Sequence, residues 1–181
     1  MQGINSSKRE NVLVMAATNT PYQLDQAIRR RFDKRIYISL PNAEARAIMF
    51  ENKIEGTPHT LQKTDFSFLG EKTEGFSGSD IEVIVKDVLF QPIRIVQEAT
   101  HFRTILQPDG SHGYMPCSPG AQGAFEATMH TLKEAGYAEQ VIPPPISRND
   151  FERALVRARP TVSAADLDMY IQYTKEFGEN G

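Results

Sequence analysis

The feature that most constrains the fold of this chain is a long amphipathic segment near its middle. It begins at Ser77-Gly78-Ser79-Asp80, where a serine followed three residues later by an acid forms the pattern of a capping box. Apolar residues then recur with helical spacing, and they are Ile81, Ile84, Val85, Val88, Leu89, Ile93 and Val96. The pattern predicts a long helix with one apolar face, and Pro92 is expected to kink it.

Shorter helical patterns flank this segment. Asn42 is a suitable N-cap for a helix that ends near Gly56, and a second helix is predicted for Lys63 to Lys72. The apolar face of the first consists of Ala45, Ile48, Met49 and Ile54. After residue 146 the helical pattern returns with a capping box at Ser147-Arg148-Asn149-Asp150, and Pro160 should end that helix. Its apolar stripe consists of Phe151, Ala154, Leu155 and Ala158.

A final helix is predicted to start near Ser163, with Gly178 as its C-cap. One face carries Leu167, Tyr170, Ile171 and Thr174, with Phe177 a turn further on. Between the helices, residues 101–146 are rich in proline and glycine and break the helical pattern. Gly113 to Met115 and Ala124 to Thr128 are expected to pair as strands, so this stretch is interpreted as an insertion, part β and part loop.

The beginning of the chain has a different pattern. Val12 to Ala17 is a continuous apolar run, typical of a strand buried on both faces of a parallel sheet. Arg35 to Ser39 is a second candidate strand, and Tyr22 to Arg31 is long enough for a short helix. Two strands do not make a stable doubly wound sheet. We therefore expect an incomplete α/β subdomain, and a chain that starts partway through a domain, followed by a mainly helical subdomain with a small β insertion and a C-terminal helix.

Composition excludes several classes of protein. Hydrophobic residues make up 40% and charged residues 24% of the 181 residues, as in ordinary globular proteins. A net charge of −3 argues against a generally nucleic-acid-binding surface. The single cysteine, Cys117, cannot form an internal disulfide, and the scattered histidines lack the spacing of metal ligands. A reducing intracellular setting fits, no run has membrane-spanning length, and no metal site is expected.

Three consecutive arginines, Arg29, Arg30 and Arg31, follow the first apolar run. Adjacent guanidiniums repel one another, so the run suits an anionic partner better than a core, and arginine holds phosphate with a fixed fork of donors. A solvated charged turn is the alternative. Elsewhere the chain has no phosphate-binding Gly-x-x-x-x-Gly-Lys-Ser/Thr loop, no acidic pair suited to magnesium and no zinc or nucleophile motif. Judged on chemistry alone, it lacks a complete active site.

The combination of motifs nevertheless resembles the second half of an AAA ATPase module. The matching segments are Ala17-Thr18-Asn19, Leu24 to Asp33, Leu40-Pro41-Asn42 and Thr73 to Ile81. The resemblance is closer still to the vacuolar protein sorting type, which disassembles ESCRT-III polymers. It rests on an arginine run without a Pro-Gly or Phe-Gly spacer, on Lys86 to Arg94, on Met115 to Gly120 and on Arg159 to Val162. It is poorest between Gln107 and Gln140.

This resemblance implies roles for individual residues. Asn19 would be the sensor-1 residue that orients the attacking water, although a strand-ending asparagine that caps a turn is the alternative. Arg30 and Arg31 would be arginine fingers that act on ATP bound to the neighbouring subunit. Which two of the three arginines do so is left open, and the third is expected to form a structural ion pair.

On the nucleotide side, Gly78 and Ser79 would lie beside the adenine, or simply cap the helix. Met49 is a further candidate for the base pocket, although a methionine on an amphipathic stripe is more often part of the core. The insertion would dock an activating cofactor protein. The implied domains are residues 1–41 (the end of the large α/β subdomain), 42–101 and 147–160 (the helical small subdomain), 102–146 (the β insertion) and 161–181 (the C-terminal helix).

The full-length protein would be a cytoplasmic ATP hydrolase that uses ATP and Mg²⁺, forms a ring expected to be hexameric and acts on ESCRT-III at endosomal membranes. It would reach these membranes only through its partners, without binding nucleic acid. A microtubule-interacting domain, P-loop, Walker B motif and pore loop should precede Met1, and whether Met1 is a natural start is left open. This chain alone is expected neither to hydrolyse ATP nor to bind nucleotide tightly.

Two alternatives remain open at this stage. The chain would be a non-enzymatic module that binds ring interfaces and the cofactor protein, or part of another AAA protein such as a microtubule-severing enzyme. The insertion between Phe102 and Ile146 argues against the severing enzymes, whose helices are expected to connect more directly.

Overall fold

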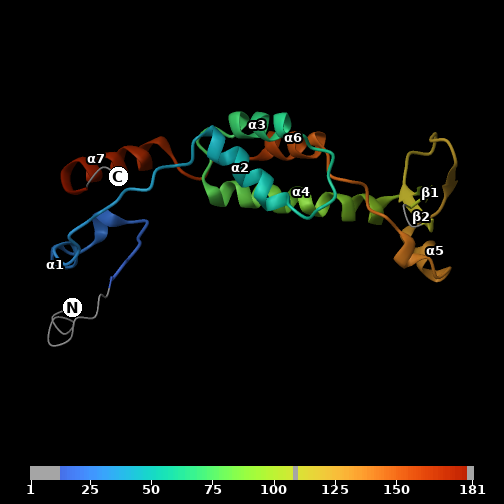
Figure 1. The fold of residues 1–181 in the computed structure, drawn as a ribbon, viewed down its shortest axis with the longest axis horizontal. Coiled ribbons are helices and arrows are strands. Elements are labelled where there is room, and N and C mark those ends of the chain that lie inside the picture. Colours follow the sequence, from blue (N-terminus) through green and yellow to red (C-terminus); the bar gives the residue numbers. More distant parts are fainter. Residues whose placement is uncertain (1–12, 108–109, 179–181) are drawn as a thin grey trace. The chain divides into compact units, whose positions relative to one another are not determined.

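The computed structural model describes residues 13–107 and 110–178. The chain divides into two compact units, Leu40–Thr161 and the combination of Met1–Ser39 with Val162–Gly181 (Figure 1). In the described part of the chain, no helix combines the length and the apolar character needed to cross a bilayer.

Four helices build the centre of the first unit, which we call the helical unit (Figure 1). They are α2 (Ala43–Ile54), α3 (Lys63–Lys72), α4 (Gly78–Glu98) and α6 (Arg148–Arg157). Helix α2 packs on α3 and α4, and α6 packs on α4. The prediction for α3 has the observed bounds, and the others agree to within a few residues. Helix α4 continues through Pro92 to Glu98.

Local side-chain bonds explain where these helices begin. The Asn42 side chain accepts a hydrogen bond from the Ala45 N–H at 2.8 Å. Capping boxes start α4 and α6, where Asp80 and Asp150 each accept the backbone N–H of the serine three residues earlier at 2.8 Å. Such bonds satisfy N–H groups that have no partner inside the helix. These starts were predicted from sequence because each cap is a contact over three residues.

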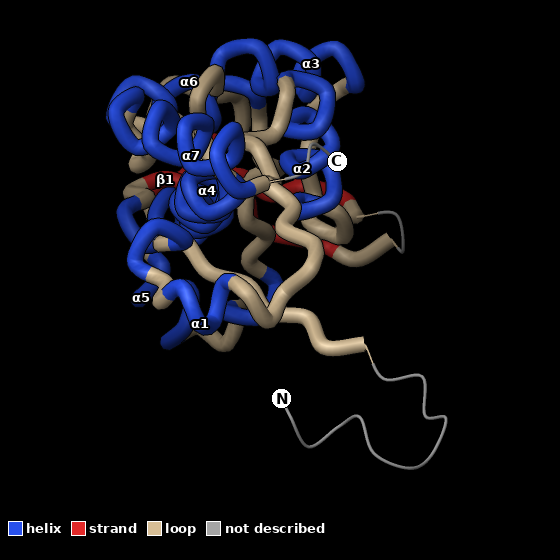
Figure 2. Tube along the Cα trace, turned by 90° about the vertical axis from the view of Figure 1, so that its left-hand side faces the viewer, coloured by secondary structure: helices blue, strands red, loops and turns tan. Residues whose placement is uncertain are grey.

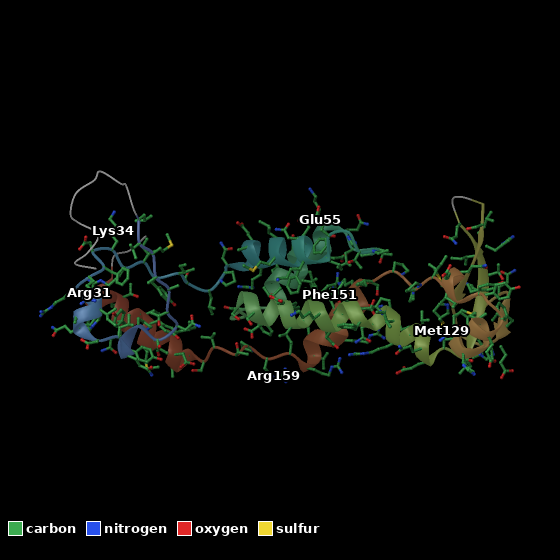
Figure 3. All side chains as sticks on the ribbon, turned by 90° about the horizontal axis from the view of Figure 1, so that it is seen from below. Arg31, Lys34, Glu55, Met129, Phe151 and Arg159 are labelled. Atoms are coloured by element: carbon green, nitrogen blue, oxygen red, sulfur yellow. The ribbon has the colours of Figure 1, made fainter. Side chains whose placement is uncertain are left out.

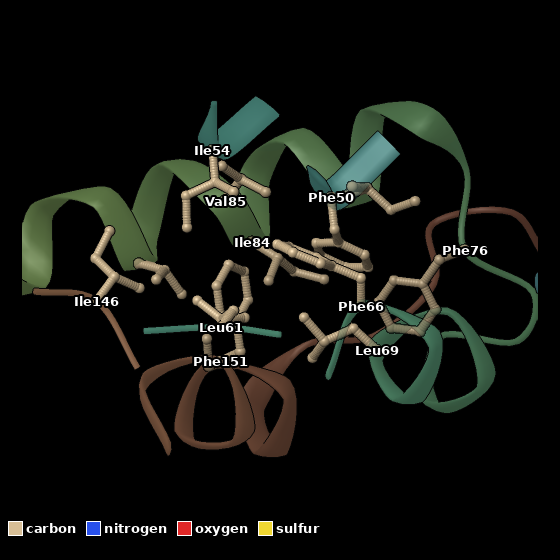
Figure 4. Packing of buried hydrophobic residues seen from close by; sticks show 13 residues of the cluster. Phe50, Ile54, Leu61, Phe66, Leu69, Phe76, Ile84, Val85, Ile146 and Phe151 are labelled. Atoms are coloured by element: carbon tan, nitrogen blue, oxygen red, sulfur yellow. The ribbon is translucent and has the colours of Figure 1, made fainter. Parts of the chain in front are cut away.

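The core of the helical unit is built from apolar side chains of all four helices and the loops between them (Figure 4). It comprises Phe50, Ile54, Leu61, Phe66, Leu69, Phe76, Ile81, Ile84, Val85, Val88, Ile146, Phe151 and Ala154. Phe50 and Phe151 are fully buried and meet edge to face, with ring centroids 5.6 Å apart. Burying one such side chain stabilises the fold by about 1.5–3 kcal/mol. The buried stripe of α2 is Arg46, Phe50 and Ile54, whereas Ile48, predicted on the apolar face, is 55% exposed.

A three-stranded antiparallel sheet follows α4 and appears in red in Figure 2. Its strands are β1 (His101–Leu106), β2 (His112–Pro116) and β3 (Ala124–Glu126), in the order β2-β1-β3. Both segments predicted to be strands form strands. They pair with β1 rather than with each other, and β1 was not predicted. Fully buried Phe102 pairs in register with Pro116 on one side and Phe125 on the other.

Helix α5 (Met129–Glu134) completes this part of the unit and was also not predicted. Strand β3 stops at Glu126, short of the predicted Thr128, because Thr128 caps α5 by accepting the Thr131 N–H at 3.2 Å. A short 3-10 turn, Ala138–Gln140, leads to the return of the chain towards α6.

The second unit contains a 3-10 turn (Pro21–Gln23), α1 (Gln26–Arg29) and α7 (Ala164–Phe177). The ring of Tyr170 on α7 lies 6.3 Å from that of Tyr22 and 6.1 Å from that of Tyr37. Helix α7 begins after Ser163, as predicted, and the Gly178 N–H bonds the Thr174 carbonyl at 2.8 Å. None of the described residues of α7 is buried.

The two strands predicted near the N-terminus are not formed. Residues 13–17 have no regular secondary structure, and residues 35–39 contain one bridge residue, Ile36; Val12 lies outside the described residues. Met15 and Ile38 are 84% and 88% exposed. A strand needs neighbours for its backbone hydrogen bonds, and the incomplete sheet expected from the sequence does not supply them.

Candidate functional site

The arginine run lies at the end of α1. The side chain of Asp25 caps the helix by accepting the Ala27 N–H at 2.8 Å, and the last turn closes with the Arg31 N–H on the Ile28 carbonyl at 3.0 Å. Arg30 and Arg31 are exposed, and within residues 13–107 and 110–178 neither has an ion pair; Figure 3 labels Arg31. Two cationic side chains are therefore presented to solvent at one short turn.

Arg29 is in a different environment. Its guanidinium lies 4.9 Å from the ring centroid of Phe177, within the range of a cation–π contact. Its Nε atom is buried and has no hydrogen-bond partner among the described residues. Arg29 thus has a structural contact, but with an aromatic ring rather than the predicted ion pair. The structure therefore distinguishes Arg29 from Arg30 and Arg31. The sequence alone left open which two of the three arginines act together.

Asn19 lies in an exposed bend rather than at the end of a strand. Its backbone carbonyl accepts a hydrogen bond from the Tyr170 hydroxyl at 2.7 Å, which fixes the main chain at this position. Partial burial raises the pKa of the Tyr170 phenol above its usual value, with further contributions from Tyr22 and Asp166. The phenol therefore stays protonated, as its role as donor requires.

Gly78 and Met49 are brought together in the helical unit. A Cβ atom placed on Gly78 would lie 3.8 Å from Cε and 3.9 Å from Sδ of Met49, which is ordinary contact distance. Gly78 has no positive φ, so neither backbone conformation nor packing within this unit requires a glycine there. Ser79 beside it is exposed, and Met49 is partly buried against the core. Met49 is thus a core residue that also lies beside Gly78.

Directly after these residues, Asp80 is 5% exposed and accepts several hydrogen bonds. The Ser77 N–H and hydroxyl donate to one oxygen at 2.8 Å each, and the Thr161 hydroxyl donates to the other at 2.7 Å. Burial alone would raise the pKa of this carboxyl, but the bonds from Ser77 and Thr161 outweigh it and leave the pKa below its usual value. Asp80 is therefore an anion that fixes the first turn of α4.

Sequence reasoning did not identify Arg46, which is 5% exposed in the middle of α2. Its Nε and Nη2 donate to the Gly70 carbonyl at 3.1 and 2.8 Å, and Nη1 donates to the Pro41 carbonyl at 2.6 Å. Nε also donates to the Thr73 hydroxyl oxygen at 3.2 Å. Two of these oxygen partners, on Gly70 and Thr73, lie at the C-terminal end of α3, where the helix dipole is negative. Only the long-range partners reveal this role, so no local pattern could have found it.

The predicted site residues fall into two groups. Asn19, Arg30 and Arg31 belong to one unit, and Gly78, Ser79 and Met49 belong to the helical unit. Among the described residues, no group of three or more His, Cys, Asp or Glu side chains is placed to hold a metal ion. Gly78 faces Met49 at ordinary contact distance, and the sequence contains no phosphate-binding P-loop motif.

Comparison with protein families gives two matches. Residues 1–40 match the ATPase family associated with various cellular activities (AAA). Residues 114–178 match the Vps4 C terminal oligomerisation domain, which here extends from β2 to the end of α7.

Curated relatives agree with these matches. The chain is 58% identical to the Arabidopsis thaliana protein SUPPRESSOR OF K(+) TRANSPORT GROWTH DEFECT 1, over 100% of the chain and 40% of that protein. It is 43% identical to mouse vacuolar protein sorting-associated protein 4B, over 100% of the chain and 41% of that protein. The chain therefore spans about two fifths of the length of these relatives. Xenopus tropicalis spastin is more distant, with 32% identity over 98% of the chain and 24% of spastin.

Solved structures place the fold in the same family. The FIGL-1 AAA domain matches with a TM-score of 0.69 and 29% identity, over 98% of this chain and 48% of that one. A chain of the crystal structure of Vps4 and Vta1 matches with a TM-score of 0.51 and 40% identity, over 65% of this chain and 98% of that one. Spastin matches at lower identity than the Arabidopsis and mouse proteins, which favours the Vps4 type. The chain belongs to the AAA ATPase family and represents the C-terminal part of a member of the Vps4 type.

Proposed function

We propose that this chain is the part of a ring-forming ATPase that completes the active site of a neighbouring subunit and closes over the nucleotide of its own. The observation that carries this proposal is the contrast within the arginine run. Arg29 lies against Phe177, while Arg30 and Arg31 are exposed and without an ion pair in the described part of the chain. The full-length enzyme hydrolyses ATP with Mg²⁺ and disassembles ESCRT-III polymers.

In this proposal, Arg30 and Arg31 act on ATP bound to the next subunit. When a phosphoryl group is transferred, negative charge spreads over its oxygens, and an arginine reaching in from a neighbour stabilises that charge. A fixed fork of donors serves this task better than a lysine ammonium. Asn19 acts on the subunit's own nucleotide, where its amide orients the attacking water.

Gly78, Ser79 and Met49 form the base side of the nucleotide site. The absence of a side chain on Gly78 lets the adenine lie against the first turn of α4, with the thioether of Met49 alongside. ATP supplies the phosphoryl group, and residues outside this chain hold its phosphates and Mg²⁺. Consistent with this division, we propose that the domains have the boundaries given by the sequence: 1–41, 42–101 with 147–160, 102–146 and 161–181.

The proposed partners are other copies of the subunit, an activating cofactor protein and ESCRT-III. Residues 114–178 match a family described as an oligomerisation domain, which supports self-assembly into a ring. The likeness to a chain of the Vps4 and Vta1 structure supports docking of an activating cofactor protein on the β insertion. We propose that the enzyme is cytoplasmic and is recruited to endosomal membranes by its ESCRT-III substrates, without binding nucleic acid.

Alanine substitution in the full-length enzyme tests the assignment of the fingers. We expect Arg30→Ala or Arg31→Ala to lower kcat by about 10³-fold or more while leaving the Kd for ATP unchanged, because the fingers stabilise charge only in the transition state. Arg29→Ala is the matched control, and it should lower the midpoint of thermal unfolding but retain measurable turnover. Equal losses of turnover in all three variants would contradict the distinction.

The chain alone should not hydrolyse ATP, because the phosphate-binding loop is absent from its sequence. We expect phosphate release by the purified 181 residues to equal the buffer background, even at high protein concentration. Magnesium-dependent turnover that scales with the chain's concentration, and that persists after the chain is purified by a second route, would refute this expectation.

A second candidate is a non-enzymatic module that binds ring interfaces or the cofactor protein. It is favoured by the core of the helical unit, because all thirteen of its residues lie within Leu40–Thr161 and need no other part of the chain. Upstream sequence separates the two candidates. A longer transcript that encodes a P-loop in frame supports the enzyme, whereas a start at Met1 in the mature protein supports the module.

A further inference from the structure

The chain passes between its two units twice, from Ser39 to Leu40 and from Thr161 to Val162. At both places, the backbone on the helical-unit side is bonded to a buried charged side chain of that unit. Arg46 bonds residue 41 at the first crossing, and Asp80 bonds residue 161 at the second. Each of the two charged side chains is 5% exposed. Buried charges are rare in proteins. Of the three buried charged side chains among the described residues, Arg46 and Asp80 lie at the crossings, whereas Asp150 caps α6.

At the first crossing, the Arg46 guanidinium holds the carbonyl of Pro41 at 2.6 Å. The same group is fixed in turn by the Gly70 carbonyl, which accepts from Nε and Nη2 at 3.1 and 2.8 Å. A planar fork held on two sides has little rotational freedom. Residue 41 is therefore tied to the end of α3, and the ring of Pro41 restricts the backbone of Leu40 before it.

At the second crossing, Asp80 holds residue 161. The Thr161 hydroxyl donates to Oδ1 at 2.7 Å, and the Thr161 N–H lies 3.4 Å from Oδ2. Oδ2 also accepts from Ser77, so the carboxylate cannot turn away without breaking the capping box of α4. Pro160 immediately precedes Thr161 and stiffens the chain on the same side of the crossing.

On the far side of Thr161 the chain is fixed again. The Ser163 N–H donates to Asp166 at 3.1 Å, and the Ser163 hydroxyl donates to the same carboxylate oxygen at 2.6 Å, so Ser163 belongs to the capping box of α7. Val162 is the one residue left between the two anchored positions. At the first crossing, residues 37–40 have no regular secondary structure, and Pro41 is the first residue held by Arg46.

We propose that Arg46 and Asp80 are positioning residues that clamp the chain at both crossings, at residues 41 and 161, to the helical unit. For the enzyme, this inference rests on the proposed function. The first turn of α4 carries Gly78 and Ser79, and Asp80 in that turn holds the segment leading to α7. Thr161, the last residue before Val162, is thereby held at a fixed position beside the proposed base-side residues of α4.

Two substitutions of Thr161 test the clamp in the 181-residue chain without nucleotide. Thr161→Val removes the donated hydrogen at nearly constant shape and leaves the Ser77–Asp80 capping box intact, whereas Thr161→Ser retains the hydroxyl. The measurement is ¹⁵N relaxation of the backbone amides, with α4 as internal reference. In the natural chain and in Thr161→Ser, we expect order parameters at residues 159 and 161 near the value of about 0.85 that is typical of rigid backbone.

In Thr161→Val, the same amides should fall below about 0.6, the range of flexible backbone, while the order parameters of the α4 amides remain unchanged. Order parameters at residues 159 and 161 that do not differ between Thr161→Val and Thr161→Ser would overturn the clamp. Because this measurement needs no ATP, such a result would leave the proposed function standing.

Kinetics of the full-length enzyme provide a second readout. We expect Thr161→Val to lower kcat several-fold with an unchanged KM for ATP, and Thr161→Ser to restore kcat. Unchanged kcat in Thr161→Val would overturn the positioning role, even if the linker became mobile. If instead Arg30→Ala and Arg31→Ala left turnover unchanged, the proposed function would fail while the clamp measured by relaxation still stood.

Discussion

At the scale of single residues, Arg46 shows how a buried cation is accommodated without an acid. Its partners are the Gly70 and Pro41 carbonyls and the Thr73 hydroxyl, and none of them carries a formal charge. The partial charges at the end of α3 take the place of a carboxylate. Thr73 itself is fully buried and donates to the Leu69 carbonyl at 2.7 Å. This partner of Arg46 at the end of α3 is therefore itself hydrogen-bonded inside the core.

Replacing Arg46 should therefore be costly. We expect Arg46→Met to lower the free energy of unfolding by about 2–3 kcal/mol, because buried oxygens lose a charged donor. Urea unfolding followed by far-ultraviolet circular dichroism measures the change. Arg159→Met is the matched control. Arg159 is exposed and, within residues 13–107 and 110–178, bonds only the nearby carbonyls of Val156 and Ala158, so its loss should stay within about 0.5 kcal/mol. Equal losses would refute the role of Arg46.

At the scale of elements, the contact between α2 and α3 depends on Gly70. A Cβ atom at this position would lie 2.3 Å from the Ala43 carbonyl oxygen and 3.1 Å from the Ala47 Cβ. The missing side chain lets the two helices approach closely enough to build the core around Phe50 and Leu69. The same approach places the Gly70 carbonyl within reach of Arg46.

Gly70→Ala tests this contact. Alanine favours a helix over glycine by about 1 kcal/mol, yet we expect a net destabilisation of about 1–3 kcal/mol because a backbone oxygen cannot move aside cheaply. Gly120→Ala is the control, since an added Cβ there meets no atom within 4 Å. Differential scanning calorimetry should show a lower midpoint for Gly70→Ala alone. A stabilised Gly70→Ala variant would show that the helices separate easily.

The elements also show how far sequence reasoning reached. Helices α2, α3, α4, α6 and α7 were predicted because their caps and apolar stripes act over three to seven residues. Strand β1 and helix α5 were missed, since the pairing of Phe102 with residues 116 and 125 is not visible in any short window. The strand predicted for Val12 to Ala17 is not formed in its described residues 13–17, because a strand requires partners that the described chain does not supply.

Site positions fixed by local contacts were predicted from the sequence, whereas those fixed by contacts between distant residues were not. Gly78 and Ser79 are placed by a local capping box, so their position at the start of α4 was predictable. The separation of Arg29 from Arg30 and Arg31 depends on Phe177, and the roles of Arg46 and Asp80 depend on Gly70 and Thr161. None of these contacts between distant positions leaves a pattern in a single sequence. The roles of Asn19, Arg30, Arg31, Gly78, Ser79 and Met49 in the enzyme remain predictions.

At the scale of the whole molecule, the proposed function makes this chain a contributor to two active sites. Under the proposed function, Arg30 and Arg31 serve a neighbouring subunit, and Gly78 and Ser79 serve the subunit's own nucleotide. A ring requires such an arrangement, because each interface joins two different surfaces of identical subunits. The match of residues 114–178 to an oligomerisation domain agrees with this view.

Mixing two inactive full-length variants tests the central claim most directly. One variant carries Arg30→Ala with Arg31→Ala and keeps its P-loop, and the other keeps both arginines but carries a disabled P-loop. Each alone should be inactive. Random assembly at equal amounts places an intact nucleotide beside intact arginines at about one quarter of the interfaces, so the account predicts up to about a quarter of the natural ATPase rate. A mixture no more active than either variant alone would contradict it.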